Sequence, residues 1–194
     1  MNVIFDLGNV VVTWDPVAIV RSVIEGPGAV RLAEQLFAHA DWVEVDRGTL
    51  TLDEAALRAI ERTDVDADII HAIYRAVAPS LQPLPQSVEL LHSLKKQGHQ
   101  LYALSNMGHV SADYLQQHGV FWPLFNDVII SARVGLVKPE LAIYRHMLQQ
   151  FGLRAEEAVF IDDSLPNVLA ARELGLRAIH YLSHAQCLAE LLVE

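Results

Sequence analysis

Short apolar segments alternate with helical segments in this chain from about residue 86 onward. Runs rich in Val, Ile and Leu predict strands at residues 99–106, 127–131, 158–164 and 176–181. Helical apolar spacing around them predicts helices at 87–98, 110–119, 139–152, 166–175 and 184–194. This alternation is typical of a parallel sheet covered by helices on both faces. The apolar segment 2–5 is expected to join the sheet, so the sequence predicts a three-layer α/β fold.

Residues 15–82 interrupt the alternation. Apolar residues recur there at helical spacing in four segments, 15–24, 29–40, 52–63 and 67–78. Thr51 followed by Glu54 matches the capping box that begins a helix, and two prolines within 81–86 suit a linker. The sequence therefore predicts an all-helical insertion at 15–82, a small four-helix bundle, and a core domain formed by 1–14 and 83–194.

The composition argues against several classes of protein. Of the 194 residues, 24 are acidic and 14 are Lys or Arg, so the formal charge is −10. No basic block interrupts that balance, and a nucleic-acid partner is not expected. No apolar run approaches the length that spans a bilayer, and the N-terminus lacks the pattern of a secretory signal. With Cys187 as its single cysteine, the chain is expected to be soluble and cytoplasmic, without membrane partners.

Conspicuous polar residues stand at the carboxyl ends of the predicted strands or in the loops that follow. They are Asp6, Ser105, Asn106, Lys138, Asp162 and Asp163. Each alone is an ordinary turn or cap residue. Their joint occurrence is harder to explain by packing, because the carboxyl ends of parallel strands meet at the edge where ligands bind.

This set of side chains suits one phosphate group and one divalent cation. Three carboxylates can hold Mg²⁺, a hard cation that prefers oxygen ligands. Ser105 and Asn106 can donate hydrogen bonds to a phosphoryl oxygen, and Lys138 can offset the negative charge. A carboxylate such as Asp6 can attack phosphorus and form an aspartyl-phosphate, with the cation screening the repulsion.

The order of these motifs resembles that of the haloacid dehalogenase superfamily. Its four motifs are matched by FDLGNVVV at 5–12, LSN at 104–106, VGLVKPELAIY at 134–144 and FIDDSLPN at 160–167. DRGTLTLDEA at 46–55 and FWPLFNDVIIS at 121–131 extend the match over nearly the whole chain. The paired Asp of the fourth motif is similar to that of phosphatase-type members with a helical cap. Among these, the chain resembles bacterial alpha-glucose-1-phosphate phosphatases and the phosphatase domain of epoxide hydrolases.

The resemblance implies a Rossmann-like core with an inserted helical cap, and Mg²⁺-dependent hydrolysis of a small phosphorylated metabolite such as glucose 1-phosphate. It implies Asp6 as nucleophile and metal ligand. The backbone carbonyl of Gly8 and the side chain of Asp163 would be further ligands. Asp162 would act through a metal-bound water or as a weaker ligand. The resemblance gives no oligomeric state.

The same resemblance implies the residues that hold the substrate. Ser105 and Asn106 would bind the phosphoryl group, and Lys138 would stabilise its charge. Asn167 would orient Asp162, Asp163 or Lys138. These roles belong to the phosphatase-type members of the superfamily.

One position departs from the family. Most of its phosphatases have a second Asp two residues after the nucleophile, which protonates the leaving group, and this chain has Gly8 there. A positioned general acid contributes about 10²- to 10⁴-fold. Three explanations stay open: the substrate has a good leaving group such as an anomeric sugar phosphate, another residue such as Asp15 or His109 supplies the proton, or the protein only binds phosphorylated ligands.

Two rival functions follow. A non-catalytic phosphometabolite-binding protein fits Gly8 but leaves Asp6, Lys138 and Asp163 without a purpose. A metal-independent 2-haloacid dehalogenase shares the Asp nucleophile but has no use for the acidic pair at the fourth motif. In the cap region, Trp14 and Trp42 either stack on a sugar ring or pack internally.

Overall fold

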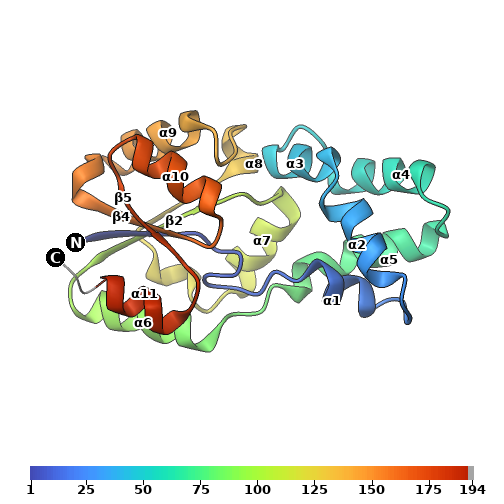
Figure 1. The fold of residues 1–194 in the computed structure, drawn as a ribbon, viewed down its shortest axis with the longest axis horizontal. Helices are drawn as coiled ribbons and strands as arrows, with labels where there is room; N and C mark the ends of the chain where they lie inside the picture. The colour runs from blue at the N-terminus through green and yellow to red at the C-terminus, as the bar shows by residue number, and fades with distance from the viewer. Residues whose placement is uncertain (192–194) are drawn as a thin grey trace.

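A five-stranded, fully parallel sheet forms the centre of the computed structural model, which describes residues 1–191 (Figure 1). The strand order is β3-β2-β1-β4-β5. The strands are β1 (Asn2–Phe5), β2 (Gln100–Ser105), β3 (Asp127–Ile130), β4 (Ala158–Asp162) and β5 (Arg177–His180). The predicted α/β fold is confirmed. Because β1 lies in the middle, residue 6 emerges between the ends of its two neighbours.

Alternate residues of each strand pack into different hydrophobic cores. On β1, Val3 and Phe5 belong to one core and Ile4 to the other, as the two-residue period of a strand requires. One face is covered by α6 (Pro85–Lys96), α7 (His109–His118) and α11 (His184–Leu191). The other is covered by α9 (Leu141–Phe151) and α10 (Leu165–Glu173) (Figure 1).

Three short helices complete the core domain. The short helices are α8 (Ser131–Val134), η1 (Trp122–Leu124) and η2 (Ala155–Glu157).

Pro139 was expected in the first turn of a helix, but α9 begins at Leu141 and Glu140 is its N-cap. The predicted last helix, 184–194, extends past the described residues, since 192–194 lie outside them. Within residues 1–191, no helix combines the length and apolarity needed to cross a membrane.

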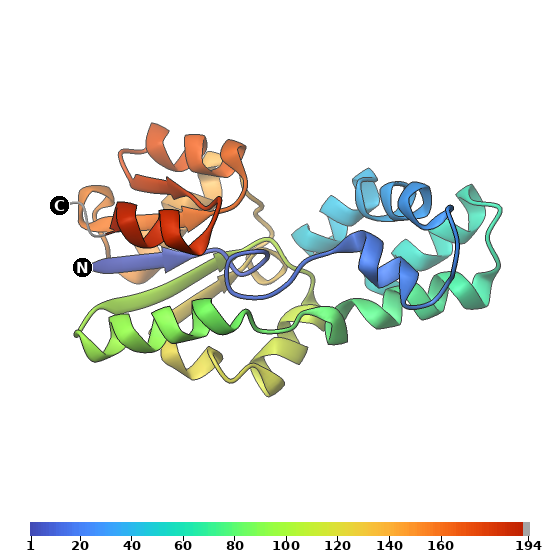
Figure 2. The same ribbon diagram turned by 60° about the horizontal axis from the view of Figure 1, so that its bottom comes forward.

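Five helices fill the segment between β1 and α6, grouped beyond one end of the sheet (Figure 2). They are α1 (Pro16–Arg21), α2 (Ala29–Phe37), α3 (Ala40–Arg47), α4 (Leu52–Arg62) and α5 (Ala67–Ser80). These helices enclose a hydrophobic cluster of their own, which includes Ile19, Leu36, Ile70 and Ile73. The predicted capping box of Thr51 and Glu54 is present at the start of α4.

The prediction of four helices in this segment is wrong, because α3 is a separate helix. The chain is extended at His39 (φ −78°, ψ 153°), so α2 does not run on to residue 40. The His39 ring accepts a hydrogen bond from the Asp41 backbone N–H and begins a new helix. The sequence predicts one helix over 29–40 because Phe37, Ala38 and Ala40 are all compatible with a continuing helix.

Asp41 ties α3 to α4. Its carboxylate is buried and accepts hydrogen bonds from Arg58 (3.1 Å) and Arg62 (2.7 Å). Burial by itself raises the pKa of Asp41, but the two guanidinium groups outweigh it and hold that pKa below its usual value. The folded helical segment therefore favours the charged carboxylate.

We expect Asp41→Asn to lower the free energy of unfolding at pH 7 by about 1–3 kcal/mol, since charge-assisted hydrogen bonds are lost. Because folding lowers the pKa of Asp41, the ionised carboxylate stabilises the fold at pH values above its unfolded pKa, which is near 3.9. This stabilisation is lost as the pH falls through the lower pKa of the folded state. The difference in free energy of unfolding between wild type and Asp41→Asn should therefore become smaller below about pH 4. Urea unfolding at several pH values measures it, with the exposed Asp64→Asn as control. Equal midpoints for wild type and Asp41→Asn would contradict this account.

Candidate active site

Asp6 lies at the edge of the sheet, directly after β1. Its backbone N–H still donates to the Ile161 carbonyl of β4 (2.8 Å), so the sheet fixes its position. The Leu7 N–H donates to Asp6 Oδ1 (2.7 Å). The chain then turns back, because three successive N–H groups, of Val10, Val11 and Val12, converge on the Leu7 carbonyl. The turn leaves Asp6 only 8% exposed, at the bottom of a cavity.

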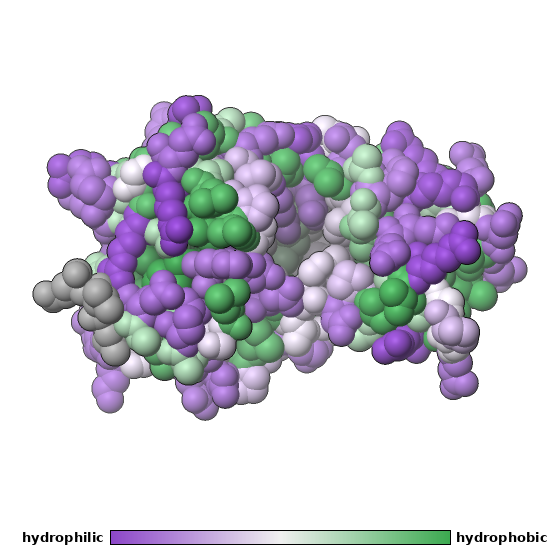
Figure 3. All heavy atoms as spheres, viewed as in Figure 1, coloured by the Kyte–Doolittle hydropathy of each residue, from purple (hydrophilic) through white to green (hydrophobic). Residues whose placement is uncertain are grey.

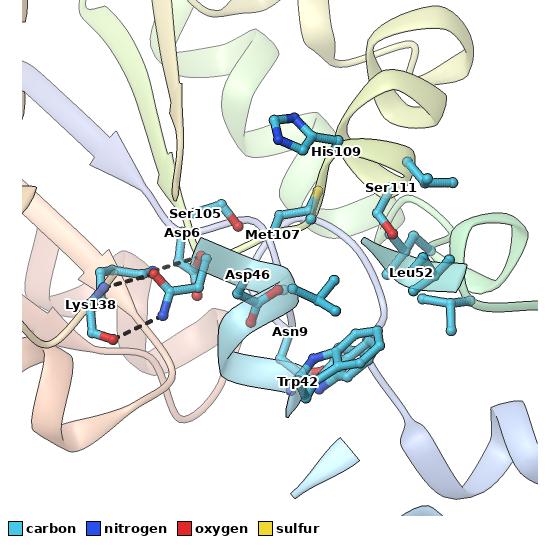
Figure 4. Close-up of a pocket in the computed structure, with 18 of the residues that line it drawn as sticks. Asp6, Asn9, Trp42, Asp46, Leu52, Ser105, Met107, His109, Ser111 and Lys138 are labelled. Carbon is cyan, nitrogen blue, oxygen red and sulfur yellow. Dashed lines mark hydrogen bonds and ion pairs between the residues drawn. The ribbon is translucent and has the colours of Figure 1, made fainter. Parts of the chain in front are cut away.

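Lys138 connects the tips of three neighbouring strands, and Figure 4 shows it beside Asp6. Its Nζ lies 2.9 Å from Asp6 Oδ1 and 2.6 Å from Asp162 Oδ2, and it donates to the Leu104 carbonyl of β2 (3.0 Å). An ammonium group has three donors, so all of them are engaged. Burial lowers the pKa of Lys138, but the two carboxylates outweigh this and raise it above its usual value. Lys138 is therefore a fixed positive charge.

Asn106 and Asn167 hold this arrangement in place. The Asn106 amide clamps the backbone of Lys138, accepting from its N–H (2.8 Å) and donating to its carbonyl (2.9 Å). The Asn167 Nδ2 contacts both oxygens of Asp162 (3.0 and 3.1 Å). The Ser164 N–H also donates to Asp162 Oδ1 (2.8 Å). Asp162, which is wholly buried, is thus saturated by protein donors.

The acidic cluster suits a hard cation. Asp6, Asp162 and Asp163 each offer a carboxylate oxygen, and these atoms lie within 4.8 Å of one another. Oxygen donors at such spacing fit Mg²⁺. Because the oxygens of Asp162 are already engaged, Asp6 and Asp163 are better suited to direct ligation. Asp163 is half-buried and accepts from the Asn9 side-chain amide (3.0 Å).

Asn9 shapes the turn between Asp6 and the first helix. Its backbone is left-handed (φ 53°), a conformation that Asn adopts more readily than most residues. Its carbonyl oxygen Oδ1 accepts from the Trp14 N–H (3.1 Å), while its Nδ2 holds Asp163. This one side chain therefore couples the turn after β1 to the end of β4.

A cavity of about 320 Å³ opens above these groups, between the sheet edge and the helical segment (Figure 3). Its floor is polar and includes Asp6, Ser105, Asn106, Lys138 and Asp163. Its upper wall is largely apolar and comes mainly from the helical segment, with Trp14, Trp42, Val45, Leu50, Leu52 and Val77. The rings of Trp14 and Trp42 stack with centroids 5.6 Å apart. The cavity thus has a charged end and an apolar end.

The structure brings the sequence-predicted residues together. Asp6, Gly8, Ser105, Asn106, Lys138 and Asp163 all line the cavity, and Asp162 lies beneath it. The two candidates for the missing acid differ. Asp15 is exposed and caps α1 by accepting from the Ala18 N–H (2.9 Å), whereas His109 lines the cavity at the start of α7.

Asp46 is a cavity residue that sequence reasoning missed. It is half-buried in the last turn of α3 (Figure 4). Burial raises its pKa to about 7; nearby Lys138 opposes the rise and Asp6 adds to it. A signal was present: a carboxylate in the last helical turn, before Arg47 and Gly48, is unfavourable to the helix dipole. An acidic residue there calls for another explanation.

Comparisons with known proteins agree with this geometry. A family model for haloacid dehalogenase-like hydrolases matches residues 1–175. A sesquiterpene phosphatase of Aspergillus oryzae is 30% identical over 177 residues, 91% of this chain and 87% of the relative. A haloacid dehalogenase-family enzyme of Bacteroides thetaiotaomicron, crystallised with magnesium and inorganic phosphate, is 22% identical with a TM-score of 0.72 over 92% of each chain. The structure of a dehalogenase is 16% identical with a TM-score of 0.77 over 100% of this chain and 97% of that one.

The chain belongs to the haloacid dehalogenase-like hydrolases, and the predicted family is confirmed. The two structural similarities establish the fold. The sequence relative places a phosphatase among its homologues. The resemblance to alpha-glucose-1-phosphate phosphatases stays a prediction.

We expect Lys138→Met to lower the free energy of unfolding by about 3–5 kcal/mol in metal-free buffer, because it leaves two buried carboxylates without their counter-ion. Chemical denaturation measures the loss. Lys96→Met, an exposed lysine at the end of α6, is the matched control and should change stability by less than about 0.5 kcal/mol. Similar losses in the two variants would show that the Lys138 ion pairs do not stabilise the fold.

Proposed function

We propose that this hydrolase is a Mg²⁺-dependent phosphatase that acts on a small phosphorylated metabolite through an aspartyl-phosphate on Asp6. The observation that carries the proposal is the position of Asp6. It is a nearly buried carboxylate beside a fixed ammonium group, on the floor of a cavity that Ser105 also lines. A nucleophile, a compensating charge and a hydrogen-bond donor are the requirements of phosphoryl transfer.

Each residue has a defined role in this proposal. Asp6 attacks phosphorus, and its orientation is held by Lys138 and the Leu7 N–H. Ser105 donates from its hydroxyl to a phosphoryl oxygen. Asn106 uses one N–H of its amide on the Lys138 backbone, so its second N–H is available for the phosphate. Lys138 contributes its charge rather than a direct hydrogen bond, since its donors are engaged.

Asp6, Asp163 and the carbonyl of Gly8 would hold Mg²⁺, with Asp162 behind them. When bound, the cation neutralises phosphate charge and lowers the repulsion between the carboxylate and the phosphoryl group. Lys138, Asn167 and Ser164 hold the Asp162 carboxylate in a fixed orientation at the back of that site. The magnesium and phosphate bound by the Bacteroides enzyme support this assignment.

The cavity favours a substrate with an apolar organic group. Its wall of Trp, Val and Leu side chains offers few partners to sugar hydroxyls, and unpaired hydroxyls are costly to bury. The sesquiterpene phosphatase relative acts, by its name, on a compound of that character. We therefore favour a phosphate ester with an apolar carbon skeleton over the sugar phosphate that the sequence predicts. Residues 15–82 would act as the cap that sets this preference.

The two rivals are less well supported. A dehalogenase shares this fold and an Asp nucleophile, yet the acidic pair Asp162 and Asp163 beside Asp6 has no use in metal-free carbon–halogen chemistry. A binding protein would not require a nucleophilic carboxylate aimed at the phosphate position. A binding protein also does not explain why Asp6, Lys138 and Ser105 converge on one floor.

We expect the purified protein to release phosphate from hexyl phosphate only with Mg²⁺, and Asp6→Asn to be inactive because the nucleophile is lost. Each buried methylene is worth about 0.8 kcal/mol, so kcat/KM for hexyl phosphate should exceed that for glucose 1-phosphate by about tenfold or more. Phosphate release is the measurement, and the exposed Asp53→Asn is the matched control.

A preference for glucose 1-phosphate would overturn the apolar substrate but keep the phosphatase. Halide release from 2-chloropropionate without Mg²⁺ would instead favour the dehalogenase. Binding of hexyl phosphate without turnover, in wild type and Asp6→Asn alike, would favour the binding protein.

A further inference from the structure

The end of α3 is fixed to the core through successive residues. Val45 packs so closely on Gly108 that a Cβ at residue 108 would lie 2.7 Å from Val45 Cγ1. The Ser131 hydroxyl donates to the Asp46 carbonyl, and its oxygen also accepts from the Met107 N–H (2.8 Å). These contacts set the height and rotation of the last turn of α3 above the sheet edge.

The next two residues continue the contact. Both terminal nitrogens of Arg47 pair with the carboxylate of Glu140, at 3.1 and 2.7 Å. Gly48 has a left-handed backbone (φ 80°) and lies against the backbone of Ala132, where a Cβ would collide with the carbonyl oxygen. The bidentate ion pair and the glycine contact fix the chain after Asp46, and the Val45 contact fixes it before Asp46.

This docking directs the Asp46 side chain into the cavity. Asp46 lies there near Asp6 and Trp42, between the polar floor and the apolar wall (Figure 4). A leaving-group oxygen occupies the same level, because it joins the phosphate on the floor to the organic group above it. Among the described residues of the helical segment, Asp46 is the acidic residue that lines the cavity.

The surroundings of Asp46 favour a proton on it near neutral pH. Because burial raises its pKa to about 7, Asp46 holds a proton near neutral pH far more readily than a free carboxyl group does. The other ionisable side chains lining the cavity are Asp6, His109, Lys138 and Asp163. Burial also raises the pKa of Asp6 to about 7; when Asp6 is ionised it favours protonation of Asp46, whereas the positive Lys138 opposes it.

We propose that Asp46 is the general acid and base of the reaction, and that it replaces from the helical segment the carboxyl group absent at Gly8. The proposal rests on the proposed phosphatase function. In the first step, an oxygen of Asp6 bonds to phosphorus as the bond from phosphorus to the ester oxygen breaks. The ester oxygen takes the proton of Asp46 and leaves as an alcohol.

The second step restores both residues. Water attacks the phosphorus of the aspartyl-phosphate, and Asp46, which is now ionised, removes a proton from that water molecule. The bond between phosphorus and Asp6 breaks, its electron pair returns to the carboxylate, and inorganic phosphate leaves. Asp46 is again protonated, so no other reactant is needed.

Leaving-group dependence tests this role. For hexyl phosphate, whose alkoxide is a poor leaving group, Asp46→Asn should lower kcat/KM by about 10²- to 10⁴-fold. For p-nitrophenyl phosphate, which needs little protonation, the loss in kcat/KM should stay below about tenfold. Since the variant also lacks the base, rapid-quench experiments with p-nitrophenyl phosphate should show phosphorylated protein accumulating.

Gly8 provides a matched rescue. A Cβ at Gly8 would meet only the Trp14 Cβ, at 3.8 Å, and the backbone there is not left-handed, so a side chain can begin at this position without strain. Gly8→Asp in the Asp46→Asn background should recover at least about tenfold in kcat/KM for hexyl phosphate. Gly8→Asn in the same background places a similar side chain without the acid and should not.

The outcomes separate the two proposals. An equal loss for both esters, no loss, or failure of Gly8→Asp to rescue beyond Gly8→Asn would reject Asp46 as the acid while leaving the phosphatase in place. A wild-type protein that hydrolyses neither ester rejects the phosphatase, and this role with it. Asp15→Asn, which retains a helix-capping side chain, should match wild type on both esters.

Discussion

An ammonium group enclosed by carboxylates is the interaction on which this site depends. Lys138 is 4% exposed and contacts Asp6 after β1, the Leu104 carbonyl of β2 and Asp162 at the end of β4. Two buried carboxylates without a cation between them would repel each other and lose hydration. The central strands can therefore carry acidic tips only because a loop from outside the sheet supplies this charge. The Asn106 amide holds the backbone of that loop and so helps to keep the Lys138 charge in place.

The two halves of the cavity have different origins and separate tasks. The floor is made by strand tips, which the hydrogen-bonded sheet holds at fixed spacing. The wall is made largely by helices α3 to α5 and the chain leading into α1, which pack around their own hydrophobic cluster. Chemistry can stay constant on the floor while the wall changes with the organic group. This division allows one sheet edge to serve substrates with different organic groups.

The sequence predicts the sheet and the floor well because both follow from local pattern and topology. Apolar runs indicate strands, and parallel strands must bring Asp6, Ser105 and Asp162 to one edge. It predicts the helical segment less well. The break at His39 depends on one residue becoming extended, and no periodicity marks it. The place of Asp46 in the cavity depends on tertiary docking of α3 onto α8 and the start of α7, which helical spacing does not encode.

The docked end of α3 makes the cavity depend on two separate parts of the chain. If Asp46 is the proton donor, proton transfer depends on the helical segment, whereas attack on phosphorus depends on the sheet. The contacts of Val45, Arg47 and Gly48 with the core would then hold the two groups at a fixed distance from each other. The Arg47–Glu140 pair is partly exposed and is therefore weakened by salt, so high salt would loosen the proton donor while leaving the nucleophile in place.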